Sequence, residues 1–243
     1  MKSALPPSLS SLSVSIFADG ADLGDILEAA EDPRIAGFTT NPSLMRAANV
    51  AHYRDFAAEV LEATGDRPVS FEVLGDDFNE MKRQALEISS WGSNVNVKIP
   101  ITDTHGVSAV PLIGELTREG VRCNVTAMFT LQQVESVLAA LPTEATTILS
   151  IFAGRIADTG VDPIPSMREA VAAAASYAHV EILWASPREL LNIFQADELG
   201  VDIITCTRSL RERFHSIGKD LESYSRETVQ MFHRDAEAAG YTL

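Results

Sequence analysis

The chain has 243 residues, of which 46% are hydrophobic, and a formal net charge of −15. That length and composition allow a large buried core. The acidic balance argues against a nucleic acid or an anionic membrane as a partner, because a phosphate backbone needs a basic stripe. A small anionic ligand is still compatible, since a few convergent arginines can bind it.

Eight short runs of alternating or continuous apolar residues are predicted as strands, and each is followed by a segment with a helical pattern. The predicted strands are residues 14–19, 37–42, 69–74, 94–102, 121–126, 147–153, 180–185 and 201–206. The predicted helices are residues 22–31, 50–64, 77–91, 105–119, 131–141, 167–178, 187–199, 210–217 and 221–239, with Asp76 or Asp77 and Thr130 as caps of the third and fifth.

The regular order of these elements, with no internal linker, predicts a single (β/α)8 TIM barrel over residues 13–243 with an extra C-terminal helix at 221–239. An open doubly wound sheet is the alternative, but no dinucleotide-binding GxGxxG motif follows the first strand.

Residues outside this pattern indicate the compartment. Residues 1–12 are rich in Ser and Pro and lack a continuous apolar run, so they are predicted as a loose lead and not as a signal peptide. Cys123 and Cys206 form no CxxC motif, which predicts neither disulfides nor a zinc cluster. No segment is apolar for long enough to span a bilayer, and a cytoplasmic location is expected.

The fourth predicted strand carries an unusual residue, Lys98. Val95 and Val97 alternate with Asn96 and Lys98, so the lysine shares a strand face with an amide. Lysine is rarely buried unless it is paired or has a chemical task, and burial favours the neutral amine that can attack a carbonyl. From this strand alone, a lysine whose ammonium reaches water is the simpler interpretation.

Polar residues also stand at the ends of most other strands, where catalytic groups of such barrels are found. Taken singly, each has a structural explanation: Asp19 can form a turn, and Glu72 can pair with Lys98. Taken together, they predict one cavity, with arginines beside the predicted start of the seventh helix binding an anion of phosphate size. The candidate residues are Asp19, Thr39, Asn41, Glu72, Lys98, Asn124, Thr126, Phe152, Arg155, Ser186 and Arg188.

These residues lie in segments that resemble the transaldolase family, including the fructose-6-phosphate aldolases, over nearly the whole chain after residue 13. The similar segments are 17–19 (FAD), 37–44 (GFTTNPSL), 70–73 (SFEV), 97–100 (VKIP), 123–126 (CNVT), 152–156 (FAGRI) and 185–188 (ASPR). The resemblance implies class I aldol chemistry without a metal or other cofactor.

By position, the resemblance implies that Lys98 forms the Schiff base, that Asp19 is the acid/base at the C4 hydroxyl, and that Glu72 and Thr126 orient a catalytic water. The residues implied to bind the substrate are Thr39, Asn41 and Asn124 at the dihydroxyacetone unit, and Arg155, Ser186 and Arg188 at the phosphate.

Two positions separate transferase from aldolase. Glu72 and Phe152 match transaldolases, whereas fructose-6-phosphate aldolases resembling this chain typically carry Gln and Tyr there. The resemblance therefore implies transfer of dihydroxyacetone from sedoheptulose 7-phosphate or fructose 6-phosphate to an aldose phosphate. Cleavage that releases free dihydroxyacetone and a sugar-phosphate-binding barrel without turnover are the alternatives.

The expected partners are small sugar phosphates, with neither nucleic acid nor membrane. Pro187 stands where the family usually has phenylalanine, which leaves a sugar with another anionic group, such as a sulfonate, as an alternative. The partly apolar terminal helix at 221–239 either covers its own barrel or reaches a neighbour in a homo-oligomer.

Overall fold

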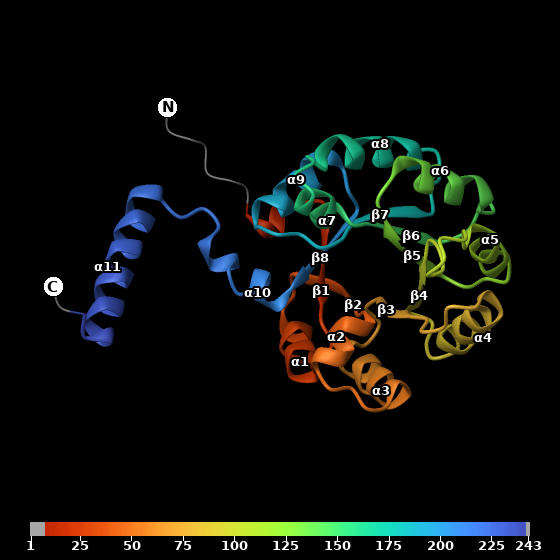
Figure 1. Ribbon diagram of the computed structural model, residues 1–243, viewed down its shortest axis with the longest axis horizontal. Coiled ribbons are helices and arrows are strands. Elements are labelled where there is room, and N and C mark those ends of the chain that lie inside the picture. Colours follow the sequence, from red (N-terminus) through yellow and green to blue (C-terminus); the bar gives the residue numbers. More distant parts are fainter. Residues whose placement is uncertain (1–7, 242–243) are drawn as a thin grey trace.

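A computed structural model describes residues 8–241 of the chain (Figure 1). Eight parallel strands pair in chain order, and β8 pairs with β1, so the sheet closes into a barrel. The strands are β1 (Ser15–Asp19), β2 (Ile35–Thr39), β3 (Val69–Glu72), β4 (Val95–Pro100), β5 (Cys123–Met128), β6 (Thr147–Ile151), β7 (Val180–Trp184) and β8 (Ile203–Thr207). The predicted (β/α)8 barrel is confirmed.

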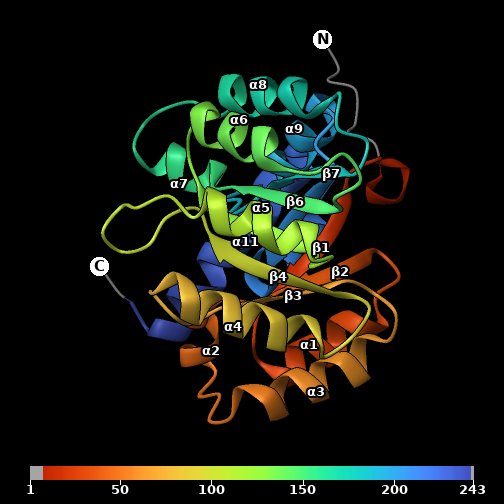
Figure 2. The same ribbon diagram turned by 90° about the vertical axis from the view of Figure 1, so that its right-hand side faces the viewer.

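Helices surround the strands on the outside, as Figure 2 shows from the side. The α-helices are α1 (Leu23–Glu31), α2 (Pro42–Ala47), α3 (Tyr53–Thr64), α4 (Phe78–Ser89), α5 (Val110–Arg118), α6 (Leu131–Ala140), α7 (Ala153–Asp158), α8 (Ile164–Ala174), α9 (Leu191–Leu199), α10 (Arg208–Arg211) and α11 (Leu221–Ala239). Two short 3₁₀ helices, η1 (Leu9–Ser11) and η2 (Phe214–Ser216), complete the described chain. Residues 1–7 of the predicted loose lead lie outside the described residues.

Two predicted helix caps are confirmed. Asp77 accepts hydrogen bonds from the N–H groups of Asn79 and Glu80 at the start of α4. Thr130 and Gln133 form a reciprocal capping box at the start of α6. These side chains satisfy backbone donors that the first turn of a helix leaves without partners, which is why both helix starts could be predicted from the sequence.

Two helices at the barrel mouth were not predicted. Helix α2 begins at Pro42 within the segment that was expected to end a strand, and the side chain of Asn41 caps it by accepting from the N–H of Leu44 at 3.0 Å. Helix α7 begins at the last residue of the predicted strand 147–153 and ends before the predicted helix 167–178. Both have only six residues, which is too short for helical periodicity to emerge.

The predicted start of the seventh helix at Pro187 is wrong, because α9 begins at Leu191. The side-chain oxygen of Asn192 accepts from the N–H groups of Arg188 and Glu189, at 2.8 and 3.1 Å. This side chain holds the segment before the helix as a loop.

Part of the barrel interior is filled by apolar side chains from β1, β6, β7 and β8. Phe17, Ile148, Leu183 and Ile203 form a small cluster there, separate from the large core between strands and helices. A Cβ at Gly37 would lie 2.5 Å from the ring of Phe17, so glycine is needed for the ring to fill this space.

Helix α11 has the predicted bounds but stands away from the barrel (Figure 1). None of its residues is buried, and Leu221, Val229 and Phe232 are 77%, 63% and 62% exposed. The helix therefore does not cover its own barrel, and the homo-oligomer stays a prediction. Among residues 8–241, no helix is both long and apolar enough to cross a membrane.

Candidate active site

A cavity of about 520 Å³ opens at the carboxyl ends of the barrel strands. Asp19, Thr39 and Glu72 are the last residues of β1, β2 and β3, and each lines this cavity. The structure brings together nine of the predicted site residues, namely Asp19, Thr39, Asn41, Glu72, Lys98, Thr126, Phe152, Arg155 and Ser186. Asn124 and Arg188 do not line the cavity.

Lys98 lies inside the barrel with its amine in this cavity. The register of β3 with β4 places Glu72 beside Lys98, and their Oε2 and Nζ atoms are 3.0 Å apart. The amine also donates to the backbone oxygen of Thr40 at 2.7 Å. Because the lysine side chain is only 7% exposed, the interpretation of an ammonium reaching bulk water is wrong.

Asp19 lies beside this pair on β1. Its Oδ1 accepts from the hydroxyl of Thr39 at 2.8 Å, and Thr39 is itself hydrogen-bonded to Thr205. Burial raises the pKa of Asp19 above 3.8, outweighing the opposite effects of Lys98 and of the Thr39 hydrogen bond. The carboxyl group therefore holds a proton more readily than an exposed aspartate, as a group that both gives and takes protons should.

The hydroxyl of Thr126 is buried at the wall of the cavity. Nothing within residues 8–241 hydrogen-bonds its Oγ1. The β5–β6 register shifts between Val125 and Met128, and Ala127 has φ = 58°, so the strand bulges directly after Thr126. A buried hydroxyl without a protein partner at a cavity wall is suited to hold a water molecule.

The two predicted substrate-binding amides are placed differently. Asn124 is fully buried; its Nδ2 donates to Ser70 at 3.0 Å, and its Oδ1 accepts from Ser150 at 2.7 Å. This amide links β5 to side chains of β3 and β6 and so braces the barrel wall. Asn41 lines the cavity; its side-chain oxygen accepts from the start of α2, and its NH2 group can donate to a ligand.

The opposite wall of the cavity carries the guanidinium of Arg155. No carboxylate in the described part of the chain lies within ion-pair distance of it, and its Cζ lies 5.5 Å from the ring centre of Phe152. Ser186 is next to it because Gly154 allows a close approach: a Cβ at Gly154 would lie 1.5 Å from the Ser186 carbonyl oxygen. Ser186 has φ = 58°, a conformation that costs free energy outside glycine.

Arg188 is turned toward Asp158 at the end of α7. Its Nε donates to Asp158 Oδ1 at 3.0 Å, and its NH2 group donates to Oδ2, so the two side chains form a bidentate pair. Hydrogen bonding by Arg188 lowers the pKa of Asp158 below 3.8. The expected helix start at this position is also absent, so a helix dipole does not add to the anion site here.

The sequence interpretation missed several residues that line the cavity. Ser150 lies on β6, two residues before Phe152, and Thr205 lies on β8, two residues after Ile203 of the interior cluster. Strand alternation could have identified both. The other missed lining residues are Pro42, Ser43, Leu44, Ala127, Phe129, Leu183 and Ala185. Residues 42–44 line the cavity only because α2 begins there, and that helix was not predicted. Phe129 lies beyond residue 126, the predicted end of the fifth strand.

Comparison with known proteins agrees with this geometry. The family described as Transaldolase/Fructose-6-phosphate aldolase matches residues 16–243. The chain belongs to this family. Curated relatives named "Probable transaldolase" include one from Roseiflexus sp. (strain RS-1), 36% identical over 82% of this chain and 88% of its own length. Another, from Dehalococcoides mccartyi, is 32% identical over 78% of this chain and 85% of its own length.

Membership in the transaldolase/fructose-6-phosphate aldolase family supports an enzyme with aldolase-type function. The solved structure of dihydrodipicolinate synthase from Rhodopseudomonas palustris is similar in fold, with a TM-score of 0.56 over 96% of this chain and 82% of that one. At 12% sequence identity, this similarity concerns the fold alone.

Proposed function

We propose that this family member is a transaldolase, which transfers a dihydroxyacetone unit between sugar phosphates through a Schiff base on Lys98. The observation that carries the proposal is a buried amine in a polar cavity, 3.0 Å from Glu72 and near a second carboxyl group with a raised pKa, Asp19. A lysine placed in this way is suited to nucleophilic attack on a ketone.

In the proposed reaction, Lys98 gives up a proton, for which Glu72 is the nearest acceptor, and its amine adds to C2 of the ketose phosphate. Loss of water gives an iminium ion. Asp19 then takes the C4 hydroxyl proton, the C3–C4 bond breaks, and its electron pair moves into the iminium to form an enamine. An aldose phosphate leaves, a second one enters, and the same steps run in reverse.

The polar wall of the cavity supports the water steps of this reaction. Water must leave when the Schiff base forms and return when it is hydrolysed. The hydroxyl of Thr126 has no hydrogen-bond partner among residues 8–241, and together with Glu72 it can hold that water near the C2 atom. Arg155 and Ser186 provide donors for the phosphate at the other end of the cavity.

A direct test uses fructose 6-phosphate and sodium borohydride, which reduces a Schiff base to a stable amine. We expect a mass increase on the peptide that contains Lys98, and turnover that depends on an added aldose phosphate. Absence of the adduct would leave a binding protein without turnover as the better alternative. An adduct with release of dihydroxyacetone that ignores the acceptor would favour the aldolase.

The first prediction concerns Phe152 and whether the dihydroxyacetone unit is transferred to an acceptor or released. Its ring lies 5.8 Å from that of Phe129 and offers no proton to a water molecule at the cavity wall. We expect Phe152→Tyr to increase acceptor-independent release of dihydroxyacetone about tenfold, because a phenol can hold and protonate such a water. Phe129→Tyr is the matched control. An unchanged ratio of release to transfer would contradict the role of Phe152.

Asp158 supplies a prediction about phosphate affinity. Because its carboxylate forms an ion pair with the guanidinium of Arg188, we expect Asp158→Asn to leave that arginine available to bind the substrate phosphate. The KM for fructose 6-phosphate should fall about three- to fivefold, the range of an exposed ion pair, with kcat unchanged. Unphosphorylated fructose should show no change.

The double variant Asp158→Asn with Arg188→Gln is the control, since it should lose the gain in affinity. A rise of KM in Asp158→Asn would mean instead that the ion pair holds Arg188 in its phosphate-binding position. Replacing fructose 6-phosphate by the corresponding sulfonate in the same assay tests the alternative anionic group. We also propose that the partners are sugar phosphates, that the protein acts in the cytoplasm and that it forms a homo-oligomer.

A further inference from the structure

The backbone of Glu72 lies where the pairing of β2 with β3 comes to an end. Along this pair, the N–H of Phe38 donates to the Pro68 oxygen at 2.8 Å, and the N–H of Thr40 donates to the Ser70 oxygen at 3.1 Å. Continuing the series by two residues, the oxygen of Glu72 would accept from residue 42. That residue is Pro42, which has no N–H and begins α2. Glu72 therefore has no strand partner on this side.

The phenol of Tyr53, from the first turn of α3, takes the place of the missing strand. Its oxygen accepts from the N–H of Glu72 at 2.8 Å and donates to the carbonyl oxygen of Glu72 at 2.9 Å. The N–H and C=O of one strand residue point to the same side, and a hydroxyl can both donate and accept, so a single phenol satisfies both groups.

The ring of Tyr53 is held firmly on the outside of the barrel. It packs edge-on against Phe71 and Trp91, with ring centres 6.2 and 5.4 Å away. Burial raises the pKa of Tyr53 well above its usual value, so the phenol keeps its proton and stays a donor. The aromatic cluster thus sets the position of the hydroxyl, and the hydroxyl sets the position of the Glu72 backbone.

We propose that Tyr53 is a positioning residue of the active site, which holds the Glu72 carboxylate beside the Lys98 amine through the Glu72 backbone. The catalytic role of Glu72 in this proposal rests on the function proposed above, whereas the contacts between Tyr53 and Glu72 do not depend on it. The side chain of Glu72 leaves the strand only one Cα atom from the two bonded groups, and its Oε2 lies 3.0 Å from Lys98 Nζ. A shift of the backbone therefore changes the distance between carboxylate and amine directly.

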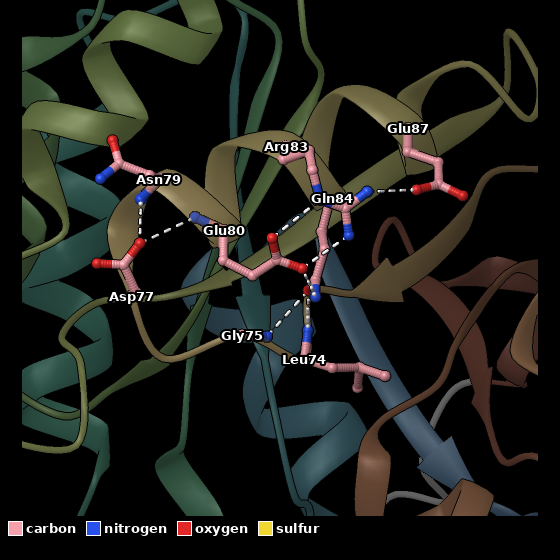
Figure 3. Close-up of polar contacts among 8 residues, drawn as sticks. All are labelled: Leu74, Gly75, Asp77, Asn79, Glu80, Arg83, Gln84 and Glu87. Carbon is pink, nitrogen blue, oxygen red and sulfur yellow. Dashed lines mark hydrogen bonds and ion pairs between the residues drawn. The ribbon is translucent and has the colours of Figure 1, made fainter.

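A second side chain, that of Gln84, binds the backbone of the segment that follows Glu72, without a hydrogen bond to Glu72 itself. The side-chain oxygen of Gln84 accepts from the N–H groups of Leu74 and Gly75 at 2.6 and 2.9 Å, and its Nε2 donates to Glu80 (Figure 3). Leu74 is exposed, so this anchor acts beyond the strand end. Gln84→Met is thus a matched control for Tyr53→Phe, because each change removes hydrogen bonds to two backbone groups of the segment and keeps the shape of the side chain.

The first test needs no turnover. The protein is treated briefly with formaldehyde and cyanoborohydride at one fixed pH, and methylation of Lys98 is measured by mass spectrometry relative to Lys219. In Tyr53→Phe we expect the ratio of Lys98 to Lys219 modification to rise about threefold, because without the two hydrogen bonds to its backbone Glu72 holds the amine less closely. Gln84→Met should leave the ratio unchanged.

The second test compares the kinetic constants of dihydroxyacetone transfer. Tyr53→Phe should lower kcat about five- to tenfold and leave the KM for fructose 6-phosphate unchanged, since the phosphate end of the cavity is untouched. Gln84→Met should leave both constants unchanged, even if its melting temperature falls as far as that of Tyr53→Phe. If Tyr53 had only a structural role, Tyr53→Phe would lower the melting temperature, as Gln84→Met does, and would leave kcat and KM unchanged.

The outcomes separate this inference from the proposed function. If Tyr53→Phe matches Gln84→Met in both the labelling ratio and kcat, Tyr53 only anchors the loop and the inference is wrong. If the wild-type protein forms no adduct with fructose 6-phosphate while the labelling ratio still rises in Tyr53→Phe, the proposed function fails and the positioning role stands.

Discussion

Lys98→Met is expected to abolish both the borohydride adduct and transfer, with a loss of kcat of about 10⁴-fold or more, as for other enzymes that lose their nucleophile. Methionine fills a similar volume but cannot bond to C2 of the ketose. The measurement is the transfer assay together with mass analysis of the Lys98 peptide. Retained turnover in this variant would refute the Schiff-base proposal.

The same variant has a consequence for stability. Removing one partner of a buried ion pair costs about 3–5 kcal/mol, but Glu72 is 15% exposed, so water can solvate it and we expect a smaller loss of about 2 kcal/mol at neutral pH. Lys82→Met is the control: this lysine pairs with Glu115 and Glu119 at the surface, and its removal should leave the adduct and turnover intact.

Asp19→Asn is expected to lower kcat by about 10²- to 10⁴-fold, the range for loss of a general acid/base, while the Lys98 adduct still forms. The amide oxygen of asparagine can keep the hydrogen bond from Thr39, so the shape of the cavity should not change. Burst measurement of the adduct separates Schiff-base formation from cleavage of the C3–C4 bond. An adduct that is lost together with turnover would assign Asp19 to the first step instead.

The variant should also be more stable than the wild type at neutral pH. Burial raises the pKa of Asp19 in the folded chain above 3.8, so the folded state binds a proton that the unfolded state has released, and ionisation costs stability as the pH rises. The gain of Asp19→Asn should therefore be absent below pH 3.8, appear as the pH rises above it, and be complete once the pH exceeds the folded-state pKa. Thermal unfolding across this range measures it.

Asp76→Asn is a control with the opposite sign. Hydrogen bonds from the hydroxyl and N–H of Thr104 lower the pKa of Asp76, so ionisation stabilises the folded chain. This variant should lose stability above pH 3.8 and match the wild type in strong acid, below the lowered pKa. If both aspartate variants changed stability in the same direction, burial could not be the cause of the Asp19 effect.

Most of the barrel could be predicted from the sequence because its strands are local patterns. The run around Lys98 alternates over its whole length, and Asp77 and Thr130 start their helices with side-chain caps that lie within a few residues. The start of α9 could not be predicted in this way. Pro187 suits the first turn of a helix, but the bonds from Asn192 to the backbone before Leu191 hold a loop there.

Contacts between residues far apart in the chain could not be predicted from the sequence either. Arg188 and Asp158 are 30 residues apart, and only the packing of α7 against the end of β7, which Gly154 permits, brings them together. The same holds for Asn124, whose amide is used by Ser70 and Ser150 from β3 and β6. In each case a residue with a suitable chemical group is already engaged by a partner that the sequence does not reveal.

The sequence by itself determined the barrel, the identity of the family and the set of polar side chains at the strand ends, because strand alternation and short motifs are properties of neighbouring residues. Only the tertiary structure decided what each side chain does: that Lys98 pairs with Glu72, that Thr126 finds no hydrogen-bond partner among residues 8–241, and that Tyr53 replaces a strand beside Glu72. These depend on distances between strands and helices, and such distances are set only when the barrel closes.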